Sequence, residues 1–169
     1  MFVGARGERF NRWASEEADG VFLAGMAPTM VGEVVGWARS ARPVEMALYL
    51  SACLDPSGEA LEAVRPRMIY AFADAPAALR RRAGLDDEAV ARAAAAMGED
   101  DPGPAAALLT DDVVDLVLAR GEGPAVAQLA AAARAHAPHS IGLALLGPDP
   151  LEQVERAGRV RAALARELR

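Results

Sequence analysis

The stretch that decides the fold is Val44-Glu45-Met46-Ala47-Leu48-Tyr49-Leu50-Ser51-Ala52-Cys53-Leu54, an almost unbroken apolar run in a chain of 169 residues. It is too long and too continuous for a surface strand, in which apolar and polar residues alternate. A run of this kind is typical of a strand buried on both faces in a parallel sheet. Asp55-Pro56-Ser57-Gly58 follows the run and ends it with turn-forming residues.

Shorter apolar segments on both sides of this run alternate with stretches of helical spacing. The predicted strands are Met1–Ala5, Val21–Ala24, Val44–Leu54 and Ser140–Leu146. The predicted helices outside the central part of the chain are Glu8–Ala18, 28–40, Gly121–His136 and Leu151–Leu168. Strands separated by helices indicate parallel βα units. Gly25 is expected to end the second strand.

The third and fourth strands are separated by a long helical stretch. Glu59–Ala73 has helical spacing, and Pro66 inside it predicts an interruption. We expect residues 76–120 to form a helical insertion within one domain of residues 1–169. Its predicted helices are Pro76–Ala83, Asp86–Met97 and Thr110–Leu118, with Asp86 and Thr110 as N-caps.

Four βα units do not close a barrel, because a (β/α)₈ barrel needs eight of them, typically in about 250 residues. Four parallel strands could form a small open sheet with helices on both faces. They could also be half of a barrel whose other half comes from elsewhere. The pattern leaves both architectures open.

Composition excludes several classes of function. All 18 basic residues are Arg, so a Schiff-base lysine and a phosphate-loop lysine are both absent. The net charge of −6 argues against nucleic acid or an anionic membrane as the main partner. Cys53 is the only cysteine, which excludes an intrachain disulfide and a multi-cysteine zinc site. No apolar run approaches a membrane span, and no signal-peptide core is present, so we expect a cytoplasmic protein.

Six short motifs follow one another along nearly the whole chain. They are Gly4-Ala5-Arg6-Gly7, Ala18-Asp19-Gly20-Val21-Phe22-Leu23, Arg82-Ala83-Gly84-Leu85, Thr110-Asp111-Asp112, Gly121-Glu122-Gly123-Pro124 and Leu146-Gly147-Pro148-Asp149-Pro150. In this order and at these separations they resemble the C-terminal half of the bacterial luciferase-like monooxygenase superfamily. The most similar members are the deazaflavin-dependent ones, such as methylenetetrahydromethanopterin reductase.

This resemblance implies an α/β fold whose four parallel βα units are the last four of a TIM (β/α)₈ barrel. It implies an oxidoreductase that transfers a hydride between coenzyme F420, or alternatively FMN, and a small organic substrate. The first four strands of the family's barrel have no counterpart here, so we expect either a homo-oligomer or an N-terminal half-barrel chain to complete it. The alternative is a non-catalytic half-barrel subunit or a ligand-binding domain. A homodimer could also close the sheet if Val44–Leu54 paired with its own copy.

Two turns are the candidate cofactor-binding site. Gly4, Ala5, Arg6 and Gly7 leave a strand and enter a helix, where backbone N–H groups favour an anion, and the resemblance implies contact with the cofactor's phosphate-bearing tail. Ala24, Gly25 and Met26 end the next strand, which would lie on the same face of a barrel. The alternative for both turns is an ordinary strand-to-helix connection.

No residue stands out as a general acid or base, so the catalytic residues stay unassigned. Cys53, in an apolar strand, is expected to be a small core residue. His136 and His139 are the only histidines and have no nearby Asp, Glu or Cys, so no metal site is expected. Asp149 is expected to cap the last helix.

Overall fold

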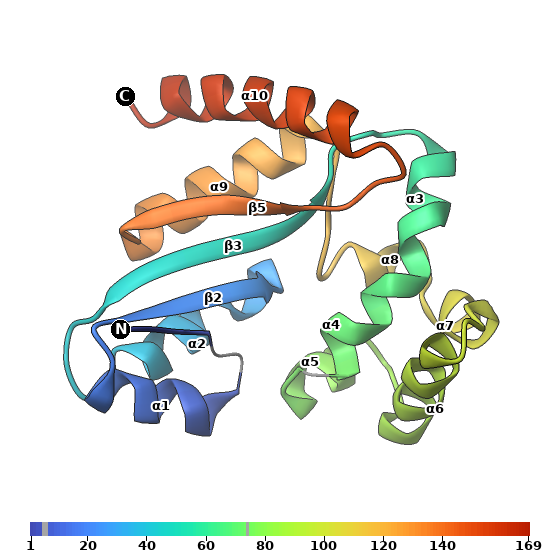
Figure 1. Ribbon diagram of the computed structural model, residues 1–169, viewed down its shortest axis with the longest axis horizontal. Coiled ribbons are helices and arrows are strands. Elements are labelled where there is room, and N and C mark those ends of the chain that lie inside the picture. The colour runs from blue at the N-terminus through green and yellow to red at the C-terminus, as the bar shows by residue number, and fades with distance from the viewer. Residues whose placement is uncertain (5–6, 74) are drawn as a thin grey trace.

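A computed structural model describes residues 1–4, 7–73 and 75–169 of the chain. The strands are β1 (Phe2–Gly4), β2 (Gly20–Met26), β3 (Glu45–Cys53), β4 (Ala119–Arg120) and β5 (Ser140–Leu145). Every strand pair is parallel, and β3 lies between β2 and β5, with β1 beyond β2. The parallel strands alternate with helices, which confirms the predicted α/β class and gives part of a TIM-barrel-like wall (Figure 1).

The central position of β3 follows from its length and its apolar side chains. β2 pairs with it from Glu45 to Leu50, and β5 pairs with its opposite edge from Ala47 to Ala52. Since both edges are occupied, β3 cannot pair with a second copy of itself, and that expected route to a homodimer is wrong. Apart from the two-residue β4, which pairs only with β3, the strands with a free edge are β1 and β5, as far as the described residues show.

The two-residue strand β4 was not predicted, because two residues are too short to show a hydrophobic period. The carbonyl oxygen of Cys53 accepts the N–H of Gly121, whereas that of the preceding Ala52 accepts the N–H of Leu146. Successive carbonyls of a strand point to opposite edges. β4 therefore extends the β2 side of β3, beyond the residue where β2 ends.

Helices that follow the strands cover one face of the sheet. They are α1 (Glu8–Glu17), the 3₁₀ turn η1 (Pro28–Met30), α2 (Val31–Ala38), α9 (Glu122–His136) and α10 (Pro150–Glu167). Alternate side chains of β2 and β3, such as Leu23 and Leu48, point into this layer and are fully buried. Figure 1 shows α1 and α10 at opposite ends of the sheet.

A series of short helices connects β3 to β4. They are α3 (Gly58–Val64), η2 (Arg65–Met68), α4 (Ile69–Ala73), α5 (Ala77–Arg82), α6 (Asp87–Gly98), α7 (Gly103–Leu108) and α8 (Asp111–Val114). The interruption predicted at Pro66 is the 3₁₀ turn η2. Asp86 caps α6 as predicted, but Thr110 makes no side-chain cap, and the helix after it ends at Val114 rather than Leu118. Helix α7 was not predicted.

The other face of the sheet has no helical layer over its middle. Phe22 is 37% exposed there, and Tyr49, on the neighbouring strand, is half-buried, with ring centroids 4.8 Å apart. The expectation that β3 is buried on both faces is therefore wrong for Glu45, Ala47 and Tyr49, whereas Ser51 and Cys53, farther along the same face, are buried as expected. In a closed barrel the same face would be the interior, where layers of side chains pack together.

Candidate functional site

The predicted cofactor residues that the structure describes meet at the carboxyl ends of β1 and β2. Gly4 is the last residue of β1 and pairs with Phe22, two residues before Ala24. Gly7 is the N-cap residue of α1 and makes no side-chain cap. Among the described residues, no atom lies within 4 Å of a Cβ built on Gly4 or Gly7, so these residues leave the space beside both glycines open. Ala5 and Arg6 lie outside the described residues.

The second predicted turn is part of a strand. β2 continues through Gly25 to Met26, so the expectation that Gly25 ends it is wrong. Gly25 has a φ of 63°, and the register against β3 shifts between Ala24 and Met26. That left-handed backbone is open to glycine at no steric cost. Such irregularities are frequent next to functional sites, where they re-aim the chain.

A hollow opens at the same edge of the sheet, where β3 and β4 end. Its volume is about 290 Å³, and it is lined by Cys53, Asp55, Pro56, Ser57, Leu61 and Arg120. The thiol of Cys53 is within hydrogen-bond distance of the Asp55 carbonyl oxygen, at 3.5 Å, and burial raises the pKa of this thiol. Since Cys53 is only 1% exposed, it is a core residue, as predicted.

The charged groups of this hollow are already paired. The Asp55 carboxylate accepts the N–H of Ser57 at 2.9 Å, and this bond holds the pKa of Asp55 below its usual value. Arg120 donates to Asp111 at 3.1 Å and also to Asp115. These contacts hold the loop together, and within the described residues both charged groups of the hollow have partners. The Asp-Pro-Ser-Gly stretch was interpreted only as a strand end, although Ser57 is an N-cap that accepts from the N–H of Ala60.

Gln153 was also missed. This residue of α10 is 2% exposed, and its Oε1 accepts the buried N–H of Leu54 at 2.8 Å. Its Nε2 is buried and has no partner among the described residues. Its signal in the sequence was weak, because a single Gln between Glu152 and Val154 in a helix is common on a surface. Asp149, in contrast, caps α10 as predicted, accepting from Leu151 and Glu152.

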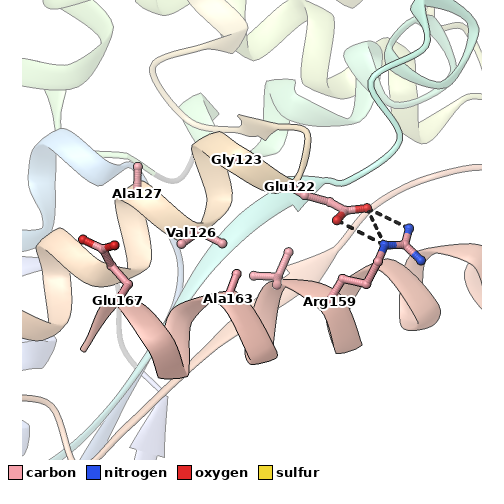
Figure 2. Close-up of a pocket in the computed structure, with 8 residues that line it drawn as sticks. Glu122, Gly123, Val126, Ala127, Arg159, Ala163 and Glu167 are labelled. Atoms are coloured by element: carbon pink, nitrogen blue, oxygen red, sulfur yellow. Dashed lines mark hydrogen bonds and ion pairs between the residues drawn. The ribbon is translucent and has the colours of Figure 1, made fainter. Parts of the chain in front are cut away.

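Another hollow, with a volume of about 380 Å³, lies between α9 and α10 (Figure 2). No strand residue lines this hollow. Its floor consists of small and apolar residues, which are Gly123, Val126, Ala127, Val160 and Ala163. Glu122 and Arg159 form an ion pair of 2.7 Å at one end, and this contact lowers the pKa of Glu122. Glu167 lies at the other end (Figure 2).

Both histidine residues take part in hydrogen bonds that join distant segments, His139 through its ring and His136 through its backbone carbonyl. His139 Nδ1 accepts the N–H of Met46 at 3.1 Å, and the carbonyl of His136 accepts from Arg39 at 2.9 Å. Within the described residues, no three His, Cys, Asp or Glu side chains come together as a metal would require. Within the same part of the chain, no helix has the length and apolar character that crossing a membrane requires.

Comparison with known proteins gives structural neighbours only. No family model and no curated protein sequence matches the chain. The structure of a coenzyme F420-dependent tetrahydromethanopterin reductase from Methanopyrus kandleri is similar, with a TM-score of 0.69 and 22% identity over 94% of this chain and 48% of that chain. The structure of apo-MsnO8 is similar with a TM-score of 0.53 and 16% identity, over 98% of this chain and 49% of the other.

The chain thus spans about half the length of the solved structures that it resembles. At such low identity the likeness concerns the backbone, and activity does not follow from fold. It supports the predicted architecture, in which parallel βα units form one part of a larger barrel. The fold of this chain is a partial TIM-barrel-like α/β fold.

Proposed function

We propose that this chain is the C-terminal half of the barrel of a luciferase-like oxidoreductase. Its cofactor is coenzyme F420, with FMN as the alternative, and its reaction transfers a hydride between the cofactor and a small organic substrate. One observation supports this most strongly: the chain overlays half of an F420-dependent reductase, and the ends of β1 and β2 form an open glycine-rich edge. In TIM-barrel enzymes this edge is the one that binds ligands.

The residues at this edge fit a phosphate-bearing cofactor. Gly4 and Gly7 have open space where side chains would stand, so a phosphate can approach the backbone. The ten-residue helix α1 starts directly after Gly7 with no side-chain cap, which leaves its first N–H groups available to an anion. Arg6 would add a charge-assisted contact. Ala24, Gly25 and Met26 would lie beside the ring system.

The redox chemistry belongs to the cofactor, which supplies the hydride acceptor or donor when bound. The chain's own residues bind and orient it. Four main strands form only part of the wall, so four further strands must complete the barrel before water is excluded from the site. We also propose that residues 76–120 are a helical insertion in a single domain, and that the protein is cytoplasmic.

Fluorescence titration of the purified chain against coenzyme F420, and separately against FMN, tests this proposal. We expect saturable binding of one of them with a dissociation constant in the micromolar range. Gly4→Val should weaken that binding about tenfold or more, because the side chain fills the space beside the backbone, and a strand accepts Val readily. Gly4 has a negative φ, so the substitution introduces no backbone strain.

Ala163→Phe is the control, since it fills the hollow between α9 and α10 and should leave cofactor binding unchanged. If Ala163→Phe abolished binding and Gly4→Val did not, the ligand would lie in the hollow between α9 and α10, which contradicts this proposal. Absence of binding to either cofactor, in the chain and in its completed barrel, would refute it.

A second candidate is a non-catalytic half-barrel that binds a ligand without turnover. The paired charges of Asp55 and Arg120 favour it, since both charged residues that line the hollow at this edge already have partners in the described part of the chain. The test is whether the bound cofactor changes its redox state when small organic donors are added to the completed barrel. Binding without such a change, for every donor in a panel, would support this candidate over the first.

A further inference from the structure

Large apolar side chains that stay exposed gather at the two free edges of the sheet. Those at the β1 edge are Met1, Phe2, Phe10 and Trp13, and those at the β5 edge are Leu151, Val154 and Leu168. The chain exposes 8562 Å², whereas a compact monomer of 17.7 kDa exposes about 8,000 Å². Edges of this kind are rarely left open, because unpaired strands invite pairing.

On α1, the exposed aromatic residues lie on the flank that faces away from the sheet's other helices. The Oγ atoms of Ser15 and Ser40 are 3.1 Å apart, which marks the flank of α1 nearest the end of α2. Phe10, Trp13 and Glu17 follow the spacing i, i+3, i+7 and lie on the opposite flank. The rings of Phe10 and Trp13 stack with centroids 5.3 Å apart.

On α10 the arrangement is the same. The ion pair of Arg159 with Glu122 marks the flank that faces α9. The opposite flank is a stripe of exposed residues three or four apart, with Arg161 as its one charged member. The stripe consists of Leu151, Val154, Gly158, Arg161, Ala165 and Leu168.

We propose that a second copy of this chain completes the barrel. The free edge of β5 in one copy pairs with β1 of the other, and α10 packs beside α1 of the other copy, at two equivalent contacts related by a two-fold axis. The four main strands β1, β2, β3 and β5 of each copy then form an eight-stranded wall. This inference rests on the proposed half-barrel and names the partner that completes it.

The two flanks fit each other in chemistry. In a closed barrel the helices run parallel and start at the same edge, so the first turns of α1 and α10 lie side by side. Apolar Phe10 and Trp13 of one copy then meet apolar Leu151 and Val154 of the other. Towards the other end of both helices, acidic Glu17 comes close to basic Arg161.

Neither Glu17 nor Arg161 has an ion-pair partner in the described part of the chain.

The open faces of the two sheets complement each other as well. Phe22 and Tyr49 of each copy would point into the shared interior, where a barrel needs side chains to fill its layers. An N-terminal half-barrel chain would meet the same edges, and a second copy is favoured because the flanks of α1 and α10 complement each other in apolar residues and in charge.

Sedimentation or light-scattering mass in the absence of cofactor tests the inference, and we expect a dimer. Glu17→Arg and Arg161→Glu should each weaken dimerisation about tenfold, because each places like charges at both contacts. An equimolar mixture of the two variants should regain the wild-type affinity. In that mixed dimer the two substituted side chains form an ion pair of reversed polarity at one contact, and the native Glu17 faces the native Arg161 at the other.

Trp13→Asp should give a monomer, and Tyr70→Asp is its matched control. Both aromatic side chains are 43% exposed, but Tyr70 lies on α4, away from both edges. Circular dichroism checks that each variant is folded, and the charge-reversal pair decides the question if Trp13→Asp is not. The mixing result is specific, since a contact of α1 with its own copy would leave Arg161→Glu dimeric.

A wild-type monomer at high micromolar concentration would overturn the inference, and so would a dimer that none of these variants weakens. A monomer that forms a stable complex with the N-terminal half of a luciferase-like barrel would overturn it in favour of that partner. The cofactor titration is independent of these outcomes. A dimer that binds neither cofactor refutes the proposed function alone, and a monomer that binds one refutes this inference alone.

Discussion

The ring of Tyr49 lies directly on the backbone of Gly142 in the neighbouring strand. A Cβ built at residue 142 would stand 2.9 Å from Cε1 of that ring, closer than real contacts allow. Phe2 covers Gly20 in the same way, on the same face but near the β1 edge of the sheet. The open face is thus covered by aromatic rings that rest on glycines, which is how this part of the sheet reduces its exposure without a helical layer.

Gly142→Ala should destabilise the protein by about 1–2 kcal/mol, because the new methyl group displaces the Tyr49 ring and its contact with Phe22. Gly36→Ala is the matched control. A Cβ at Gly36 meets no atom within 4 Å, and the residue is exposed in α2, so this change should stabilise by about 0.5–1 kcal/mol. Urea denaturation measures both. Equal effects of the two substitutions would contradict the packing of Tyr49 on residue 142.

Asp111→Asn should lower the free energy of unfolding at neutral pH. The Asp111 carboxylate accepts from Arg65 at 2.6 Å and from Arg120 at 3.1 Å, and these bonds lower the pKa of Asp111 in the folded protein. A lowered folded pKa stabilises above the unfolded pKa of about 4, and this stabilisation is lost as the pH falls further.

The difference in stability between the wild type and Asp111→Asn should therefore be constant above about pH 5 and shrink below about pH 4. Asp112→Asn is the control, since the exposed neighbour Asp112 has no ion pair in the described part of the chain. Denaturation across this pH range checks the sign. A difference that grows as the pH falls would show that the ion pair is not the cause.

Gln153→Leu should destabilise the protein by about 1–2 kcal/mol, because it leaves the buried N–H of Leu54 without an acceptor. Loss of the unpartnered Nε2 offsets part of that cost. Gln128→Leu provides the comparison, since Oε1 of Gln128 is buried with no hydrogen-bond partner among the described residues. The same substitution there should be neutral or stabilising. A smaller loss at position 153 than at 128 would be incompatible with the Leu54 contact.

Cys53 should react slowly with thiol reagents in the folded protein. It is buried, and burial raises the pKa of its thiol, so both access and thiolate fraction are low near neutral pH. Labelling in urea should go to completion with one thiol per chain. Rapid labelling of the native protein would mean that the end of β3 opens, and would reopen the question of a reactive cysteine there.

The strand and helix pattern was largely predictable because it depends on local spacing. The run Val44–Leu54 contains β3, and the interruption at Pro66 is the turn η2. Gly25 misled the prediction, because β2 continues past it through pairing with β3. Thr110 misled it as well, since the backbone turns there without the side-chain bond. At Gly25 pairing with a distant strand outweighed a local preference.

In the candidate site as well, local features could be predicted from the sequence and long-range contacts could not. The order of small residues in Gly4–Gly7 and Ala24–Met26 was visible in the sequence, and strand order alone brings these segments to one edge. The hydrogen-bond partners of Asp55, Arg120 and Gln153 could not be predicted from the sequence. Gln153 lies 99 residues from Leu54, and Arg65 lies 46 from Asp111, so neither hydrogen bond has a local signature.

Apolar periodicity and turn residues alone specified a parallel α/β chain with a helical connection after its central strand. Periodicity shows that a face is apolar, but not what covers it. Only the packed chain decided that Tyr49 and Phe22 face outward and that β1 and β5 keep free edges. The physical reason is that local backbone preferences act over a few residues, whereas burial depends on which distant segments meet when the chain collapses.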